Sequence, residues 1–294
     1  MAVRLSTKSW FPTAVLVILS AIWGSSFILI KKALISFNTI QVGALRMVFA
    51  YLAMLPFALQ AFQEIPRTQW KYMALIGFVG NFFPSFLFAI AVMNIPSAIA
   101  GVLNALTPSF TLLVGLLFYQ TKINRLQLTG LFLGLLGSAI LSLLKSDGTI
   151  GKWNGYMWLV TVATILYGFN TNMIRKHGKD IHPLFISSMS LFFIGPFAIA
   201  VFLSTDFYST FVEKPLVWQS LGYLAILGVL GSAFAVVLFN RLIQLTSAVY
   251  ASSVTYLIPI VAILWGIFDG EQLVLPHYLG MAIILIGVYM VNKR

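Results

Sequence analysis

Polar and aromatic side chains interrupt several long apolar stretches of this sequence, well away from the ends of those stretches. Amides and hydroxyls can hydrogen-bond a solute, and Trp or Tyr can also stack on it with a flat face. Such groups are costly to bury among apolar residues, so they usually face a protein interior or a wet cavity. The residues that fit this description are Trp23, Asn81, Asn104, Thr107, Tyr167, Asn170, Thr255 and Tyr256. We expect them to line one binding cavity for a small solute.

Trp23 and Tyr167 hold matching positions, each directly before a glycine (Gly24 and Gly168). Their rings could clamp a small amphipathic solute. The alternative is that each ring only packs beside a close helix contact, which the glycine permits. We favour cavity lining for both.

Three prolines, Pro84, Pro108 and Pro259, lie inside the same apolar stretches. A proline has no N–H to donate, so the carbonyl four residues earlier loses its helical partner. Pro108 should free the carbonyl of Asn104, and Pro259 that of Thr255. We expect the resulting kinks to act as gate hinges. The freed carbonyls either contact the solute or only accompany helix curvature.

Arg46 is the only charged residue well inside an apolar stretch. Its long side chain could extend outward to water, or it could bind a substrate carboxylate or the freed carbonyls. No Asp or Glu lies at comparable depth, which argues against a proton pump built on a buried carboxylate. A single buried cation also argues against a carrier of dianionic phosphates, which would need several Lys or Arg.

The composition shows what surrounds these residues. Of 294 residues, 60% are hydrophobic and 9% are charged, whereas soluble domains carry about 25% charged residues. The mean hydropathy is +0.96. Apolar runs of about 20 residues can each cross the hydrocarbon core as a helix. We predict ten spans, at 12–31, 40–62, 70–93, 97–119, 125–144, 154–174, 183–203, 218–242, 247–268 and 275–292, with 204–217 as a surface loop.

Charge sorting between the spans predicts the orientation. With a cytoplasmic N-terminus, the cytoplasmic segments hold twelve basic and two acidic residues, and the opposite side holds five of each. The positive-inside rule therefore places both termini in the cytoplasm. It also explains the net charge of +11 without a nucleic-acid partner. We predict a multi-pass protein of the plasma membrane, which is the inner membrane in a bacterium, with the lipid bilayer as its partner.

The two halves of the chain repeat each other. Residues 96–142 match 246–292 at an offset of 150 or 151, and the first and sixth spans match at an offset of 144. Five spans per copy is an odd number, so the second copy must enter the membrane inverted. Inverted repeats are typical of secondary transporters. We predict two five-helix repeats at 12–144 and 154–292; the alternative is an inert bundle that grew by duplication.

Several motifs resemble the EamA-type branch of the drug/metabolite transporter superfamily. They are IWGSSF at 22–27, ALRMVFA at 44–50, the run from Phe88 through Pro108 to Leu116, and the ending Glu271…Gly280…Gly287. The resemblance covers nearly the whole chain. It implies ten helices in a five-plus-five inverted arrangement, a central cavity, and transport of small metabolites, often export of amino acids or related solutes. In this family an acidic residue ends the fourth helix. The chain departs from that pattern with Gln120 in the first copy and keeps it with Glu271 in the second copy.

Glycine rows in the fifth and tenth spans predict close helix packing. The rows are Gly130-Gly134-Gly137 and Gly280-Gly287. In the family that the chain resembles, the corresponding helices are where protomers pair. Contact within one protomer is the alternative, so the sequence leaves monomer and homodimer open.

These features predict an all-α membrane transporter and not an enzyme. The chain has no cysteine, and its three histidines have no metal-ligand spacing. We expect no catalytic residue, metal or cofactor. The predicted activity is export of a small zwitterionic or neutral metabolite, an amino acid or similar, by alternating access. The alternatives are an exporter of amphipathic drugs and a non-carrier channel.

Overall fold

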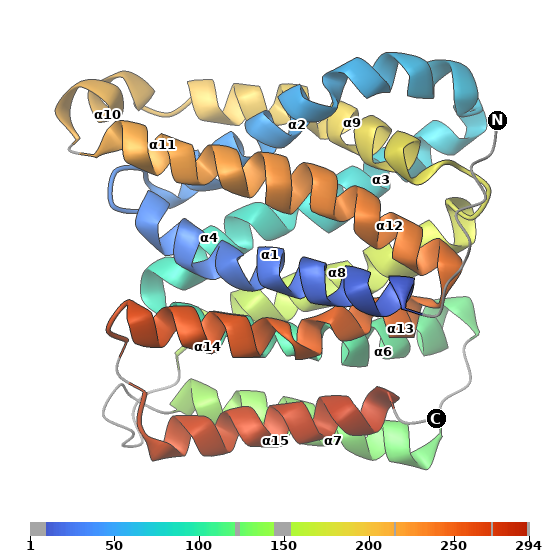
Figure 1. Ribbon diagram of the computed structural model, residues 1–294, viewed down its shortest axis with the longest axis vertical. Helices are drawn as coiled ribbons and strands as arrows, with labels where there is room; N and C mark the ends of the chain where they lie inside the picture. Colours follow the sequence, from blue (N-terminus) through green and yellow to red (C-terminus); the bar gives the residue numbers. More distant parts are fainter. Residues whose placement is uncertain (1–9, 121–123, 144–153, 215, 272, 293–294) are drawn as a thin grey trace.

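The protein is helical throughout the described residues and contains no strand there. The computed structural model describes residues 10–120, 124–143, 154–214, 216–271 and 273–292 (Figure 1). The first half forms α1 (Phe11–Ala33), α2 (Thr39–Glu64), η1 (Arg67–Gln69), α3 (Trp70–Gly77), η2 (Phe78–Phe82), α4 (Phe83–Asn94), α5 (Ser97–Leu103), η3 (Asn104–Leu106), α6 (Thr107–Tyr119) and α7 (Arg125–Leu143). The second half forms α8 (Met157–His177), α9 (Pro183–Leu203), α10 (Phe207–Glu213), α11 (Val217–Ile226), η4 (Leu227–Phe234), α12 (Ala235–Leu245), α13 (Ala248–Ser252), η5 (Ser253–Tyr256), α14 (Ile258–Phe268) and α15 (Leu275–Asn292).

Eight helical segments of the described chain are long and apolar enough to cross a membrane. Two further apolar helical stretches, Arg125–Gly137 of α7 and Leu275–Gly287 of α15, accompany them within the described residues. The all-helical membrane fold is therefore confirmed. The count of ten crossings and the cytoplasmic position of both termini stay predictions. Figure 1 shows that α1 begins and α15 ends at the same end of the helices.

The predicted surface loop at 204–217 is wrong in part, because it contains the short helix α10. The side chain of Asp206 caps this helix by accepting a hydrogen bond from the backbone N–H of Ser209. The amide of Gln41, in the first turn of α2, donates to Thr210 of α10 at 3.0 Å. This contact with α2 holds α10 against the bundle.

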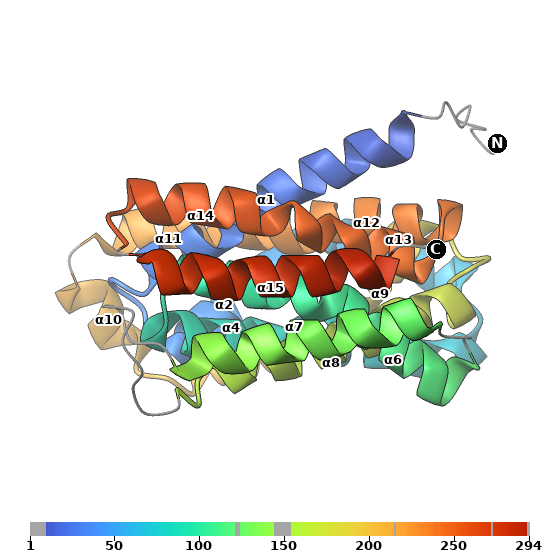
Figure 2. The ribbon, with the colours of Figure 1, turned by 90° about the horizontal axis from the view of Figure 1, so that it is seen from below.

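The two halves exchange equivalent contacts. In each half the first helix packs on the fourth segment of the other half, so α1 lies on α14 and α8 lies on α6. The second helices, α2 and α9, pack on each other, and so do the last helices, α7 and α15. Figures 1 and 2 show the α7–α15 pair as a layer at one end of the molecule. This arrangement fits two repeats that enclose a shared centre.

The glycine rows make their close contact within one chain. A Cβ added to Gly287 of α15 would lie 2.5 Å from the backbone oxygen of Gly130 and the backbone nitrogen of Gly134 in α7. A Cβ added to Gly137 would lie 3.0 Å from the backbone oxygen of Gly280. The backbones of the two helices therefore approach where only glycine fits, and they run antiparallel. No partner chain is needed to explain these glycines.

Breaks in helical geometry occur at equivalent places in both halves. The third segment of each half contains a π-helical stretch, η2 or η4, and the fourth contains a 3₁₀ turn, η3 or η5. Pro108 and Pro259 follow the two 3₁₀ turns, as the sequence predicts for a kink. Pro84 follows η2, but no proline follows η4, so proline alone does not cause the π-helical stretches. Such stretches are often found at functional sites.

Candidate substrate cavity

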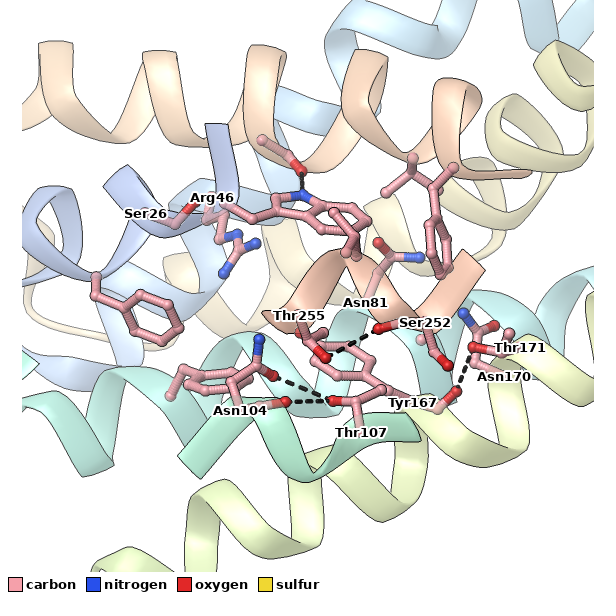
Figure 3. A pocket seen from close by; sticks show the side chains of 18 of the residues that line it. Ser26, Arg46, Asn81, Asn104, Thr107, Tyr167, Asn170, Thr171, Ser252 and Thr255 are labelled. Carbon is pink, nitrogen blue, oxygen red and sulfur yellow. Dashed lines mark hydrogen bonds between the residues drawn. The ribbon is translucent and has the colours of Figure 1, made fainter. Parts of the chain in front are cut away.

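A cavity of about 90 Å³ lies between the two halves of the protein (Figure 3). One water molecule needs roughly 10–15 Å³ of such space, so the cavity holds several waters or a small solute group. Its lining comes from the broken helices and from α1, α2 and α8. The lining residues are Trp23, Ser26, Phe27, Ile30, Arg46, Met47, Gly80, Asn81, Phe88, Asn104, Thr107, Tyr167, Asn170, Thr171, Gly231, Val236, Phe239, Ser252, Val254 and Thr255.

The structure brings together most of the residues that the sequence singled out. The residues that line the cavity are Trp23, Asn81, Asn104, Thr107, Tyr167, Asn170 and Thr255, with Arg46 beside them. Tyr256 is not among the lining residues and packs instead against the main hydrophobic cluster. Its neighbour Thr255 faces the cavity within the same 3₁₀ turn. The three prolines also lie outside the lining, next to the breaks that shape it.

Arg46 projects into the cavity and does not extend outward to water. Its Nε donates a hydrogen bond of 2.7 Å to the hydroxyl of Ser232, which belongs to the π-helical stretch η4 of the other half. Figure 3 shows its guanidinium directed into the cavity. No Asp or Glu belongs to the described lining, so Arg46 supplies the only formal charge there. A lone cation in a partly dry site favours an anionic group on the ligand.

The freed carbonyl of Asn104 is not left unpaired. The backbone N–H of Thr107 and its hydroxyl, at 2.7 Å, both donate to the Asn104 backbone oxygen in place of the N–H that Pro108 lacks. This contact corrects the prediction of an open carbonyl at this position. It leaves the side chain of Asn104, rather than its backbone, to face the cavity.

Asn170 carries a buried acceptor that lacks a partner within the described protein. Its Oδ1 makes no hydrogen bond, and its side chain is 7% exposed. The amide lies flat on Gly80, where an added Cβ would be 2.4 Å from Cγ of Asn170. An unpaired buried acceptor costs about 1–3 kcal/mol. A ligand N–H donor would remove that cost once the amide turns to present Oδ1 to the cavity.

Aromatic rings form the apolar walls of the cavity. The indole N–H of Trp23 donates to the Gly231 carbonyl at 2.8 Å, and its ring meets Phe239 edge-on at 5.1 Å. Across the cavity, Phe88 packs against Tyr167 at 6.0 Å. Gly24 contacts Val261 while Trp23 faces the cavity, so cavity lining and close glycine packing occur together.

Sequence reasoning missed several lining residues. Three are phenylalanines, and the others include the small residues Gly80, Gly231 and Ser252. The phenylalanines carry no polar signal that separates them from the many core aromatics. Gly80 and Gly231, however, are related by the offset of 151 that also relates Pro108 to Pro259. The repeat therefore contained a signal for these two.

An ionic latch, formed by Lys31, Lys32, Asp269 and Glu271, joins the halves at one end of the bundle. Lys31 Nζ lies 2.7 Å from Asp269 and 2.9 Å from Glu271, and Lys32 pairs with Asp269. Glu271 also accepts hydrogen bonds from the start of α5, namely from the backbone N–H and hydroxyl of Ser97 and the N–H of Ala98. The latch thus ties α1 and α5 of the first half to the loop after α14.

The latch carboxylates stay ionised well into acid. Burial alone would raise the pKa of Glu271, but hydrogen bonds from Lys31, Ser97 and Ala98 outweigh it and hold the pKa below its ordinary value. Burial would likewise raise the pKa of Asp269, but hydrogen bonds from Lys31 and Lys32 outweigh it. The pKa of Asp269 is therefore also below its ordinary value. The latch therefore contributes stability above the ordinary carboxyl pKa and loses it as the pH falls through the lowered values.

Glu271→Gln should weaken the latch and admit reagents to the cavity from that end. Ile30, next to Lys31, lines the cavity, and the chain has no cysteine. In an Ile30→Cys background we expect Glu271→Gln to raise the labelling rate by an impermeant maleimide about tenfold, because hydrogen bonds to a charged group contribute about 1.5–3 kcal/mol. The matched control is Glu213→Gln, which removes an exposed carboxylate outside the latch. Equal labelling rates in all three proteins would contradict the latch.

The pH dependence of the same pair of proteins supplies a second check. The melting temperature of the Ile30→Cys protein should exceed that of its Glu271→Gln derivative by a constant margin above about pH 5. The margin should disappear as the pH falls through the lowered carboxyl pKa values. A margin that disappears between pH 6 and pH 8 would mean that another group controls the latch.

Comparisons with known proteins agree with this architecture. The EamA-like transporter family matches residues 11–143 and 153–293. The inner membrane transporter YedA of Escherichia coli K12 is 27% identical, over 92% of this chain and 87% of that protein. A transporter of Archaeoglobus fulgidus is 23% identical over 98% of this chain and 99% of that protein.

Two further similarities are informative. A protein of Chlamydia muridarum, named an S-adenosylmethionine/S-adenosylhomocysteine transporter, is 25% identical over 83% of this chain and 80% of its own length. A crystal structure with 15% sequence identity aligns with a TM-score of 0.65 over 96% of both chains, which shows a shared fold. With family matches across both halves and apolar helices suited to crossing a membrane, the chain is a multi-pass plasma-membrane protein that belongs to the EamA-like transporter family.

Proposed function

We propose that this protein exports a small zwitterionic metabolite that carries a carboxylate, such as an amino acid. The observation that supports this substrate class most directly is Arg46, the only charged residue of the described cavity lining. Its guanidinium would pair with the substrate carboxylate. The unpaired Oδ1 of Asn170 would accept from an ammonium or amide N–H, and the aromatic walls would contact an apolar portion.

The Chlamydia relative supports the same chemistry. Its named ligands each combine an amino-acid group with a flat aromatic base. This cavity offers a cation for a carboxylate and rings for a flat apolar group. An exporter of cationic drugs that lack a carboxylate fits less well, because such a ligand offers Arg46 no anionic partner and the described lining has no Asp or Glu to bind the cation.

Alternating access is the mechanism that we propose. Matching π-helical stretches and 3₁₀ turns stand beside the cavity in both halves, so the same local bends are available to open either end. The ionic latch joins the two halves at one end in the present conformation. In this mechanism it keeps that end closed until the halves separate. Export as the direction rests on the resemblance to EamA-type carriers.

Ligand-dependent stability and counterflow test the proposal together. A ligand that binds the native state raises its melting temperature, so we expect shifts with L-amino acids but none with polyamines, which lack an anionic group. The stabilising amino acid should then show saturable counterflow in proteoliposomes, whereas a channel would show none. Stabilisation by polyamines alone, or flux without counterflow, would refute the proposed substrate class or the carrier mechanism, respectively.

A further inference from the structure

The end of the bundle opposite the ionic latch contains a related group of residues with different charges. The sequence offsets relate Arg175 and Lys176 of α8 to Lys31 and Lys32 of α1. The offset of 151 relates Gln120 at the end of α6 to Glu271. By the same offset, Phe118 is equivalent to Asp269. The positions of both latch carboxylates are therefore occupied by uncharged residues in the first half.

These replaced residues line a second pocket. It has a volume of about 430 Å³ and lies between the ends of α6 and α8. Its lining consists of Phe118, Tyr119, Gln120, Asn172, Arg175 and Lys176. The pocket therefore occupies the position that the latch occupies in the other half.

Two cations of this pocket have no carboxylate partner within the described residues. Arg175 and Lys176 are exposed and form no ion pair there, and Lys176 lies 5.5 Å from the centroid of the Tyr119 ring. In the latch, by contrast, both lysines pair with carboxylates. Adjacent like charges repel each other, so an anion between them would stabilise this end. The exposed amide of Gln120 could donate a further hydrogen bond to it.

The surroundings of the pocket favour an anion attached to a lipid. Leu117 and Phe118, on the α6 side, are 65% and 61% exposed, which suits contact with acyl chains at the end of a membrane span. Cations at the ends of membrane helices attract anionic headgroups, and we predict this end to be cytoplasmic. We propose that this pocket binds the phosphate group of an anionic phospholipid through Arg175, Lys176 and Gln120, in place of the missing carboxylates.

Thermal unfolding of the purified full-length protein in detergent tests this proposal. Phosphatidylglycerol should raise the apparent melting temperature by about 3 °C or more, and phosphatidylcholine with the same acyl chains should not. The double variant Arg175→Gln/Lys176→Gln should lose most of the shift. Gln120→Glu introduces a carboxylate at the position equivalent to Glu271. This variant should also lose most of the shift, because the new carboxylate competes with the lipid phosphate for Arg175 and Lys176. Lys179→Gln, an exposed cation outside the pocket, should keep it.

Each outcome decides between the alternatives. Melting without added lipid shows whether the variants still fold. An undiminished phosphatidylglycerol shift in the double variant would overturn the site. A full shift with inorganic phosphate alone would retain the anion site but overturn the lipid as its source. The test does not use transport, so it is independent of the proposed substrate.

Discussion

Arg46→Gln is expected to reduce transport of the stabilising amino acid by at least about 30-fold in kcat/KM. Removing one partner of a buried charge pair costs about 2–5 kcal/mol, and each 1.4 kcal/mol corresponds to a factor of ten. The expected loss is this large because no other cation of the described lining could replace Arg46. Uptake into proteoliposomes at matched protein amounts measures it.

Stability should respond differently from transport in this variant. A lone cation inside a membrane protein is costly, so its replacement by a neutral amide should leave the melting temperature of the ligand-free protein unchanged or raised. The matched control, Lys214→Gln, removes an exposed cation outside the cavity and should transport normally. Arg46→Lys keeps the charge but loses the planar fork, and an intermediate rate is expected. Normal transport by Arg46→Gln would refute the carboxylate contact.

Gly80→Ala is expected to lower transport about tenfold, while the equivalent Gly231→Ala stays within about twofold of the parent protein. The two glycines occupy related positions in η2 and η4. A Cβ at position 80 would meet the Asn170 amide at 2.4–2.5 Å, whereas a Cβ at position 231 finds its nearest atom, the hydroxyl oxygen of Ser26, at 3.5 Å. Only the first substitution displaces a cavity amide.

A double-mutant cycle separates displacement of Asn170 from general helix damage. Asn170→Ala alone should lose about as much transport as Gly80→Ala. Gly80→Ala should then add little in the Asn170→Ala background, because both changes remove the same contact. Additive losses would show that Gly80 acts on transport without Asn170.

Much of the fold could be predicted from sequence because the membrane imposes simple requirements. Backbone groups in hydrocarbon must pair within a helix, so apolar runs of sufficient length indicate spans directly. The α10 helix was missed because seven residues with a capping Asp206 carry only a weak local signal. The π-helical stretch η4 was missed because no proline marks it.

The cavity was predictable in part for a related reason. Polar residues in the apolar runs have few places to lie except a shared interior, and most of those selected do line the cavity. The sequence selects Tyr256 as an aromatic residue with a hydroxyl inside an apolar stretch, but within the tight turn η5 only its neighbour Thr255 lines the cavity. The phenylalanines of the cavity walls could not be chosen, because Phe27 and Phe88 look the same in sequence as other core phenylalanines.

The sequence by itself determined the membrane class, the duplication and the depth of the polar residues, since these depend on hydropathy and spacing along one chain. The tertiary structure decided what each polar group does. Ser232 from the opposite half turns Arg46 into the cavity, and Thr107 pairs with the carbonyl that Pro108 leaves open. Likewise, Glu271 joins the two halves at one end, whereas Gln120 at the other end gives Arg175 and Lys176 no carboxylate partner within the described residues. These outcomes depend on contacts between segments far apart in the chain, which spacing within one segment cannot specify.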